Sequence, residues 1–139
     1  MYVELSDEAR RYMARFDELT GVAPRDCLVE GNRLVFLIPA GEMAAAIGQG
    51  GATVTEAERR LGRSVELVED ADTPEAFVAS ALAPAGVAAV TISEQDDRVA
   101  YVEVAPADRG VAIGADGQNI ETARTLAKRH YDVDDVQLT

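Results

Sequence analysis

The chain carries the same glycine pattern twice, and its residue types suit the binding of a phosphate group. The pattern Ile-Gly-x-x-Gly-x-x-[Ile/Val] spans Ile47–Val54 and recurs 66 residues later at Ile113–Ile120. A Gly-x-x-Gly turn that opens a helix lets a phosphate approach the backbone, where unpaired N–H groups and the positive end of the helix dipole point outward. One copy would mean little. Two copies in matching surroundings indicate two tandem modules that hold a phosphodiester backbone.

Basic side chains gather near each turn, on or beyond the helix that follows it. They could neutralise phosphates, or they could form a solvated helix face that pairs with Glu56, Glu58 and Glu121. A further group on the first helix is more typical of a solvated surface or of a partner contact. The three groups are Arg59, Arg60 and Arg63; Arg124, Lys128 and Arg129; and Arg10, Arg11 and Arg15.

An enzyme is the competing class. Glu69 follows the first turn by about twenty residues, as the acidic residue of a dinucleotide-binding site does. However, the glycines follow a short helix instead of a strand, and neither G-x-G-x-x-G nor G-x-x-x-x-G-K-[ST] is present. His130 is the only histidine, and its place near a helix end favours capping or surface exposure. No pair of carboxylates stands out, so we expect no enzyme, no cofactor and no metal site.

Helical periodicity and turn residues predict that each glycine turn lies between two helices. Ser6 is a candidate N-cap for a first helix that ends at Gly21, and Gly31-Asn32 is a two-residue hairpin signal. Gly62 ends the helix that follows the first turn. The predicted elements of this half are a helix from Asp7, strands at 27–29 and 34–38, a short helix at 42–46, a helix from the turn to Leu61, and a strand at 65–68.

The same order follows a short acidic linker, Glu69–Asp72. Thr73 and Pro74 give the capping residue and the first helical position of a new helix. Each half is therefore predicted to be α-β-β-α-α-β, with domains at 1–72 and 73–139. The predicted elements of the second half are a helix to Leu82, strands at Val87–Ile92 and Val99–Val104, a short helix, a helix whose face carries Ile120, Ala123, Ala127 and Tyr131, and a strand at Asp135–Leu138.

The composition is strongly acidic, with a formal net charge of −12 and a pI near 4.4. The excess is even, because residues 1–72 hold 8 basic and 14 acidic residues and residues 73–139 hold 5 and 11. Such a charge argues against nucleic acid at first sight. Yet Lys128 is the only lysine beside twelve arginines. A uniformly acidic, lysine-poor surface resembles proteins that work in multimolar salt, where the repulsion of a polyanion is screened. The alternative is an ordinary acidic protein that binds something other than RNA.

Two further features concern class and compartment. Aromatic residues make up only 5% of the chain and Trp is absent, so base stacking is not expected to dominate binding. Cys27 is alone, which leaves no disulfide and fits a reducing cytosol. Neither a signal peptide nor an apolar run long enough to span a bilayer is visible, so we expect a cytoplasmic protein with no membrane partner.

The element order, with Ile-Gly-x-x-Gly between two helices and the third strand last, resembles the prokaryotic type of KH domain (type II). A tandem pair that fills nearly the whole chain resembles the archaeal NusA family. This resemblance covers roughly residues 4–139. It implies an α+β fold of two KH domains and an RNA-binding transcription elongation or termination factor, without the polymerase-binding and S1 domains of the longer bacterial form.

The resemblance also implies roles for the residues of each turn. The paired glycines would let the RNA backbone pass without meeting a Cβ atom, the isoleucines before them would anchor the turn from below, and Val54 and Ile120 would contribute to the floor of an apolar groove. Members of the family usually carry a basic residue inside the turn, and Asp116 would instead repel a phosphate. The implied RNA-binding residues are Ile47, Gly48, Gln49, Gly50, Gly51, Val54, Arg59 and Arg60 in the first half, and Ile113, Gly114, Ala115, Asp116, Gly117, Gln118, Asn119, Arg124 and Lys128 in the second.

The function favoured by the sequence is the binding of single-stranded RNA that emerges from RNA polymerase, by a monomer that modulates pausing or termination. The RNA contact follows from the motif, whereas the role in transcription follows from the resemblance alone. A non-enzymatic module that docks on RNA polymerase or the ribosome, with little RNA binding, is the alternative. RNA binding is expected to be stronger through the first turn than through the second, because only the second carries a carboxylate.

Overall fold

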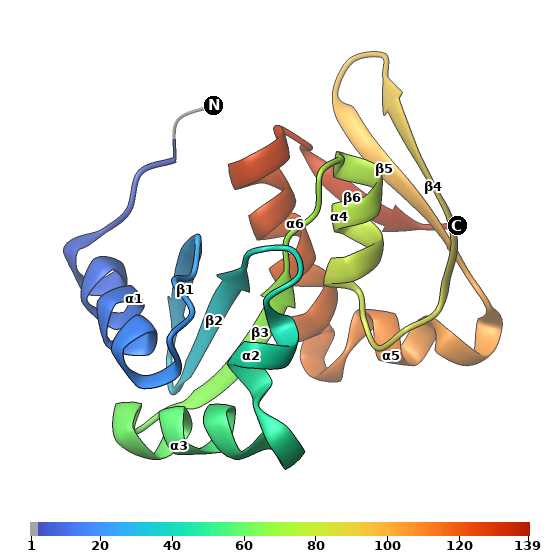
Figure 1. Ribbon diagram of the computed structural model, residues 1–139. Coiled ribbons are helices and arrows are strands. Elements are labelled where there is room, and N and C mark those ends of the chain that lie inside the picture. The colour runs from blue at the N-terminus through green and yellow to red at the C-terminus, as the bar shows by residue number, and fades with distance from the viewer. Residues whose placement is uncertain (1–2) are drawn as a thin grey trace. The chain divides into compact units, whose positions relative to one another are not determined.

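The computed structural model describes residues 3–139, which divide into two compact units, Glu4–Asp70 and Ala71–Thr139, with Val3 grouped with the latter. Both units have the element order α-β-β-α-α-β, and each contains one three-stranded sheet (Figure 1). The predicted α+β fold class, with two tandem domains of the order α-β-β-α-α-β, is therefore confirmed.

The first unit is built around a sheet in which β2 is central. Strand β1 pairs with β2 in antiparallel fashion and β3 pairs with β2 in parallel. The hairpin between β1 and β2 turns at Gly31-Asn32, as the sequence predicts. The elements are α1 (Asp7–Thr20), β1 (Asp26–Glu30), β2 (Arg33–Ile38), α2 (Met43–Ile47), α3 (Ala52–Leu61) and β3 (Ser64–Glu69), with the single 3-10 turn Gln49–Gly51 between α2 and α3.

The second unit repeats this topology with β5 in the centre of the sheet, antiparallel to β4 and parallel to β6. Its last helix has 14 residues, against 10 in the corresponding helix α3. The elements are α4 (Pro74–Ala81), β4 (Val87–Glu94), β5 (Arg98–Val104), α5 (Arg109–Ile113), α6 (Gln118–Tyr131) and β6 (Asp135–Leu138), with 3-10 turns at Pro106–Asp108 and Ala115–Gly117.

Local capping interactions explain where the helices begin and end. The Ser6 hydroxyl accepts a hydrogen bond from the Ala9 backbone N–H at 3.0 Å, and Gly21 ends α1 in a left-handed conformation. Thr73 caps α4 in the same way, accepting from the Ala76 N–H at 3.1 Å, with Pro74 at the first helical position. Within residues 3–139, no helix has both the length and the hydropathy to cross a membrane.

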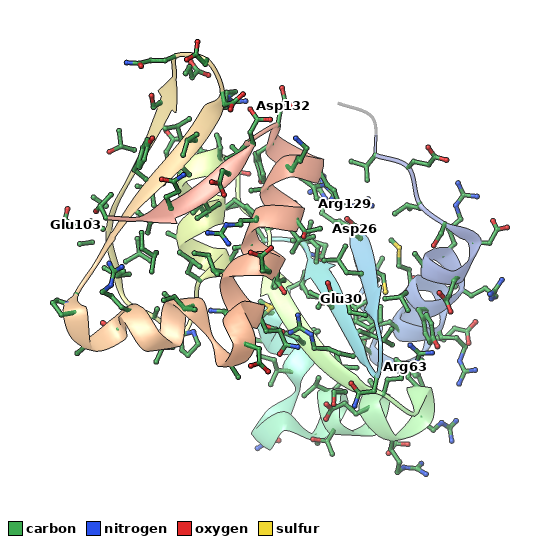
Figure 2. All side chains as sticks on the ribbon, turned by 180° about the vertical axis from the view of Figure 1, so that it is seen from behind. Asp26, Glu30, Arg63, Glu103, Arg129 and Asp132 are labelled. Atoms are coloured by element: carbon green, nitrogen blue, oxygen red, sulfur yellow. The ribbon has the colours of Figure 1, made fainter. Side chains whose placement is uncertain are left out.

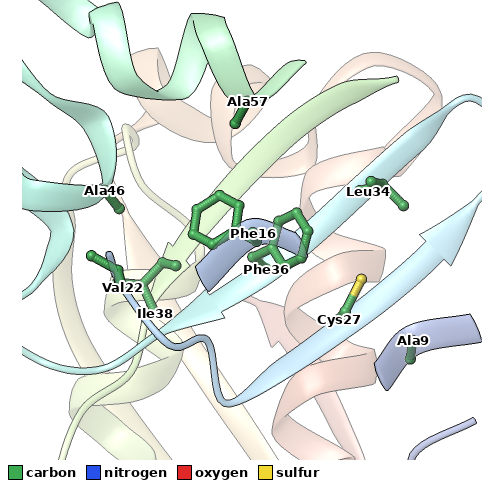
Figure 3. Close-up of a cluster of buried hydrophobic side chains, with 9 residues drawn as sticks. All are labelled: Ala9, Phe16, Val22, Cys27, Leu34, Phe36, Ile38, Ala46 and Ala57. Carbon is green, nitrogen blue, oxygen red and sulfur yellow. The ribbon is translucent and has the colours of Figure 1, made fainter. Parts of the chain in front are cut away.

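The core of the first unit lies between the sheet and its helices. Phe16 on α1 stacks on Phe36 of β2, with ring centroids 4.3 Å apart (Figure 3). The cluster also contains Cys27, whose thiol is buried; desolvation, followed by the charges of Asp26 and Glu8, raises its pKa to about 12. The cluster consists of Ala9, Phe16, Val22, Cys27, Leu34, Phe36, Ile38, Ala46 and Ala57.

The core of the second unit follows the alternation expected of a sheet with one buried face. Ala100, Val102 and Val104 of β5 are buried, whereas Tyr101 and Glu103 between them are exposed. A second aromatic pair supports the helical layer, because Phe77 of α4 stacks on Tyr131 of α6 at 4.9 Å between ring centroids. The Tyr131 hydroxyl donates a hydrogen bond to the Ala71 carbonyl.

The predicted acidic linker Glu69–Asp72 is wrong for its first two residues. Glu69 is the last residue of β3, and the Asp70 N–H donates to the Ile38 carbonyl at 2.8 Å. The Asp70 carboxylate is buried and pairs with Arg25 at 3.5 Å. Composition suggested a linker, but the pairing of β3 with β2 extends the ordered chain to Asp70.

Candidate nucleic-acid interface

Both glycine turns lie between a five-residue helix and the long helix that follows it. In the first, α2 ends at Gly48 and a single 3-10 turn leads into α3. In the second, α5 ends at Gly114 and the same arrangement leads into α6. The N-cap residues of α3 and α6 are Gly51 and Gly117, and within residues 3–139 neither helix has a side-chain cap, so the positive ends of both helix dipoles can face a ligand.

The two glycines of each turn serve different purposes. A Cβ atom at Gly48 would lie 2.1 Å from the Thr53 Oγ1 atom, and one at Gly114 would lie 2.8 Å from the Asn119 backbone nitrogen. The first glycine is therefore required by packing inside the chain. Gly51 and Gly117 have φ angles of 78° and 73°, and a Cβ atom there would meet nothing within 4 Å. The second glycine thus leaves open space into which a ligand backbone could move.

The predicted position of the isoleucines is wrong. Ile47 and Ile113 do not anchor the turns from below, because they are 37% and 38% exposed. Val111, two residues before Ile113 on α5, is also exposed. The prediction assumed that an apolar residue before a turn faces the core, but that place is taken by Ala46 and Ala112, which are fully buried. The exposed isoleucines instead add apolar surface beside each turn.

The second turn opens onto a groove of about 460 Å³ that runs from α5 and α6 to β6. Ile120, which is 5% exposed, belongs to its apolar lining, and its role as the floor of an RNA-binding groove stays a prediction. Val54, the corresponding residue of the first unit, is half-buried. The groove is lined in part by Arg109, Ile113, Asp116, Gly117, Ile120 and Leu138.

The two arginines of this groove are engaged by the chain itself. The Arg124 guanidinium pairs with Glu121, pairs with Asp135 at 3.0 Å and donates to the Val136 carbonyl at 3.0 Å. Arg109 donates to the Thr139 carbonyl at 2.9 Å. Burial acts to raise the pKa of Asp135, but hydrogen bonds from Gln137 and the Val136 N–H, together with Arg124, hold it below its usual value. The ionised carboxylate therefore neutralises Arg124.

The remaining groups of the second turn are also partly engaged. The Asn119 amide donates to the Leu82 and Val111 carbonyls, at 3.2 Å each, so both of its N–H groups are used within the chain. Gln118 and Ala115 are exposed, as is Asp116, which holds a left-handed φ of 55°. Lys128 lies further along α6 and pairs with Asp134 at 3.2 Å.

The basic cluster after the first turn divides into paired and unpaired members. Arg59 forms two hydrogen bonds with the Glu56 carboxylate, at 2.6 and 3.0 Å, and these hold the pKa of Glu56 below its usual value. Arg63, labelled in Figure 2, donates to the Gly31 carbonyl at 2.6 Å, and its guanidinium lies 5.4 Å from the centre of the Tyr12 ring. Arg60 is exposed and has no ion pair or hydrogen bond among the described residues.

Sequence reasoning missed Arg109 as a groove residue. It precedes Ile113 by four residues on α5, and residues four apart lie on the same face of a helix. That spacing was a usable signal. The contribution of Leu138 could not be found this way, because it depends on the parallel pairing of β5 with β6.

The geometry of the turns differs from that of a dinucleotide site. Both turns follow helices, and the Glu69 carboxylate accepts a hydrogen bond from the Gly41 N–H at 2.9 Å instead of facing the turn. His130 is half-buried in the last turn of α6. In the part of the chain that the structure describes, no three His, Cys, Asp or Glu side chains are grouped so that they could hold a metal ion.

Comparison with known proteins assigns both units to related families. Residues 10–73 match the KH domain family, and residues 74–138 match the family of NusA-like second KH domains. A relative from Halobacterium salinarum, named probable transcription termination protein NusA, is 59% identical over the full length of both chains. A protein of the same name from Halococcus morrhuae is 56% identical over 99% of each chain. The crystal structure of APE1850 superposes with a TM-score of 0.85 at 30% identity, covering 97% of this chain and all of that one.

Proposed function

The chain belongs to the NusA family, whose members compared above are named probable transcription termination proteins, and on this premise we propose that it binds single-stranded RNA through its two glycine turns. The RNA would be the transcript that emerges from RNA polymerase, and its capture would modulate pausing or termination. The protein would act as a monomer in the cytoplasm, without a cofactor.

The observation that carries this proposal is the shape of the two turns. Each places an open glycine at the uncapped N-terminus of a long helix, beside an isoleucine that is more than one third exposed. A phosphate can approach the open backbone, while the apolar surface beside it can receive a base or sugar. Single-stranded RNA offers both groups, because its unstacked bases are free to turn toward the protein.

The acidic, arginine-rich composition is compatible with RNA binding in concentrated salt. The similarity to relatives from Halobacterium and Halococcus fits a halophilic protein. In concentrated salt the field of 25 acidic residues is screened within a few ångströms, roughly 3 Å at 1 M. Binding then depends on contacts made at the turn, not on the net charge of the surface.

Gly50→Asp tests the first turn with little structural disturbance. Gly50 has a φ of 62°, and its counterpart in the second turn is Asp116, which already adopts a φ of 55°. An added carboxylate near a phosphate costs about 1 kcal/mol in water and more where solvent is excluded, so we expect RNA affinity to fall roughly fivefold or more. Fluorescence anisotropy with labelled single-stranded RNA measures the change.

Gly31→Asp is the matched control. It adds the same charge to the same unit at a similar φ of 56°, in the hairpin turn, where a Cβ atom would meet nothing within 4 Å. We expect this variant to bind RNA like the unmodified protein. If the unmodified protein fails to bind RNA and still associates with RNA polymerase or the ribosome, the docking function replaces the one proposed.

A further inference from the structure

A group of arginines on the helices of the first unit lies outside the glycine turn. Arg11 and Arg15 lie on α1 and Arg60 lies in the last turn of α3, and all three side chains are exposed. Helices α1 and α3 contact each other, and α3 is drawn below α1 on the left of Figure 1. The three arginines line one hollow of about 500 Å³ between these helices, together with Glu8, Tyr12 and Leu61.

These arginines are unlike the others of the described chain. Arg10, Arg25 and Arg59 of the same unit each pair with a carboxylate. Arg33 is engaged by Glu30 and Glu66. Among residues 3–139, Arg11, Arg15 and Arg60 are the arginines without an ion pair or a hydrogen bond, although acidic residues outnumber basic ones almost two to one. Their N–H groups therefore remain available to a ligand, although Glu8 lies in the same lining and the charge of Arg60 acts on Glu56.

Tyr12 gives the hollow an aromatic surface, and a further cation lies beside the lining without being part of it. The Arg63 guanidinium lies over the Tyr12 ring and donates only to a backbone carbonyl, so its charge also faces no carboxylate partner. Glu8 is the single acidic residue in the lining. A cluster of guanidinium groups on an acidic protein favours the binding of a polyanion. Each guanidinium can donate two hydrogen bonds to the oxygens of such a ligand.

We propose that this hollow, called the α1–α3 hollow, binds phosphates of the same RNA strand that the first glycine turn holds. This inference rests on the proposed RNA-binding function. Helix α3 connects the two places, because the turn precedes its first residue and Arg60 lies near its last. Ten residues of helix span about 15 Å. A strand clamped at the turn can therefore extend along α3 into the hollow.

The composition of the first turn supports RNA over an acidic protein segment as the occupant. The turn holds Gln49 and Gly50 and no cation of its own, so phosphates bound there need neutralising charge from a neighbouring surface. A strand already held by the turn reaches the hollow at a high effective concentration, whereas a protein segment would have to bind the hollow unaided.

The length of the RNA separates the two contacts. A KH turn clamps about four nucleotides, so an RNA of that length occupies the turn alone, and one of about twelve nucleotides also reaches the hollow. The test variant is Arg15→Gln/Arg60→Gln, which removes one charge from each wall. The control is Arg10→Gln/Arg25→Gln, which removes two paired arginines of the same unit that are 63% and 62% exposed. Circular dichroism verifies that both variants remain folded.

We expect the test variant to lose affinity for the longer RNA by roughly fivefold and to bind the shorter RNA unchanged, while the control changes neither. An unchanged affinity for the longer RNA, or an equal loss at both lengths, overturns the inference. Polyglutamate serves as a probe for an acidic protein segment. If its binding depends on Arg15 and Arg60 while RNA binding does not, the hollow binds an acidic protein, and the inference is overturned as well. If Gly50→Asp weakens binding but the arginine variant does not, the inference alone fails; if neither RNA binds, the proposed function fails with it.

Discussion

One residue distinguishes the chemistry of the two turns. Asp116 stands where the first turn has Gly50, and both residues have a left-handed backbone. Asp116 is exposed beside the open Gly117, so its charge meets any phosphate that approaches. In addition, the Arg124 guanidinium near it is neutralised by Glu121 and Asp135. The structure thus adds a second reason to expect weaker RNA binding by the second unit.

Asp116→Asn tests this asymmetry, because asparagine keeps the shape of the side chain and tolerates a left-handed backbone. Removing the repulsion should tighten RNA binding by roughly fivefold at low salt, the equivalent of about 1 kcal/mol. Asp132→Asn is the matched control, since Asp132 has a φ of 54° at the end of α6 and lies outside the groove lining. Anisotropy titrations measure both. A weaker affinity of Asp116→Asn would show that the carboxylate assists binding.

At the scale of elements, the two glycines of the turn between α2 and α3 differ in their surroundings. Gly48 is packed against Thr53, whereas Gly51 faces open space. Gly48→Ala would force a Cβ atom against Thr53 in addition to a strained φ of 78°. Gly51→Ala meets only the strained φ, which costs about 1 to 2 kcal/mol. We expect Gly48→Ala to lower the free energy of unfolding by at least about 2 kcal/mol more than Gly51→Ala does. Urea denaturation compares them, and equal losses would contradict the packing argument.

The same elements show what the sequence could and could not predict. The caps at Ser6 and Thr73 and the hairpin at Gly31-Asn32 were predicted correctly, because each depends on neighbours within a few residues. Glu69 and Asp70 were assigned to a linker because their order comes from pairing with a strand about thirty residues away, which composition does not reveal.

The candidate site was predictable to a similar degree. The turns and their helices follow from the repeated pattern, but the exposure of Ile47 and Ile113 depends on which side of a five-residue helix faces the sheet. The α1–α3 hollow was not predictable, because it joins residues of two helices separated by about forty positions. The sequence identified the basic groups, but it did not predict which carboxylates and carbonyls pair with them.

For the whole molecule, the net charge of −12 determines how binding and stability depend on salt. An ordinary basic protein loses RNA affinity steeply as salt rises, because fewer counterions are released. Here the proposed contacts between arginine and RNA are short-range and the repulsion from the acidic surface is long-range, so we expect salt first to remove the repulsion. We expect both RNA affinity and melting temperature to rise from low salt toward about 1 M KCl.

Anisotropy and circular dichroism over this range measure the two quantities separately. NaCl and KCl should change RNA affinity and melting temperature to the same extent, because screening depends on ionic strength. A steady fall in RNA affinity from the lowest salt upward would mean that the acidic surface is not an adaptation to salt.

The buried Cys27 provides a natural probe for local unfolding of the first unit. It is the only cysteine of the chain, and its thiol is enclosed beside Phe36 with a pKa of about 12. A thiolate-directed alkylating reagent therefore reacts only after Glu4–Asp70 opens, whereas Ala71–Thr139 is silent to it. Labelling rates followed by mass spectrometry thus give the opening of one half of a tandem protein, without an engineered probe.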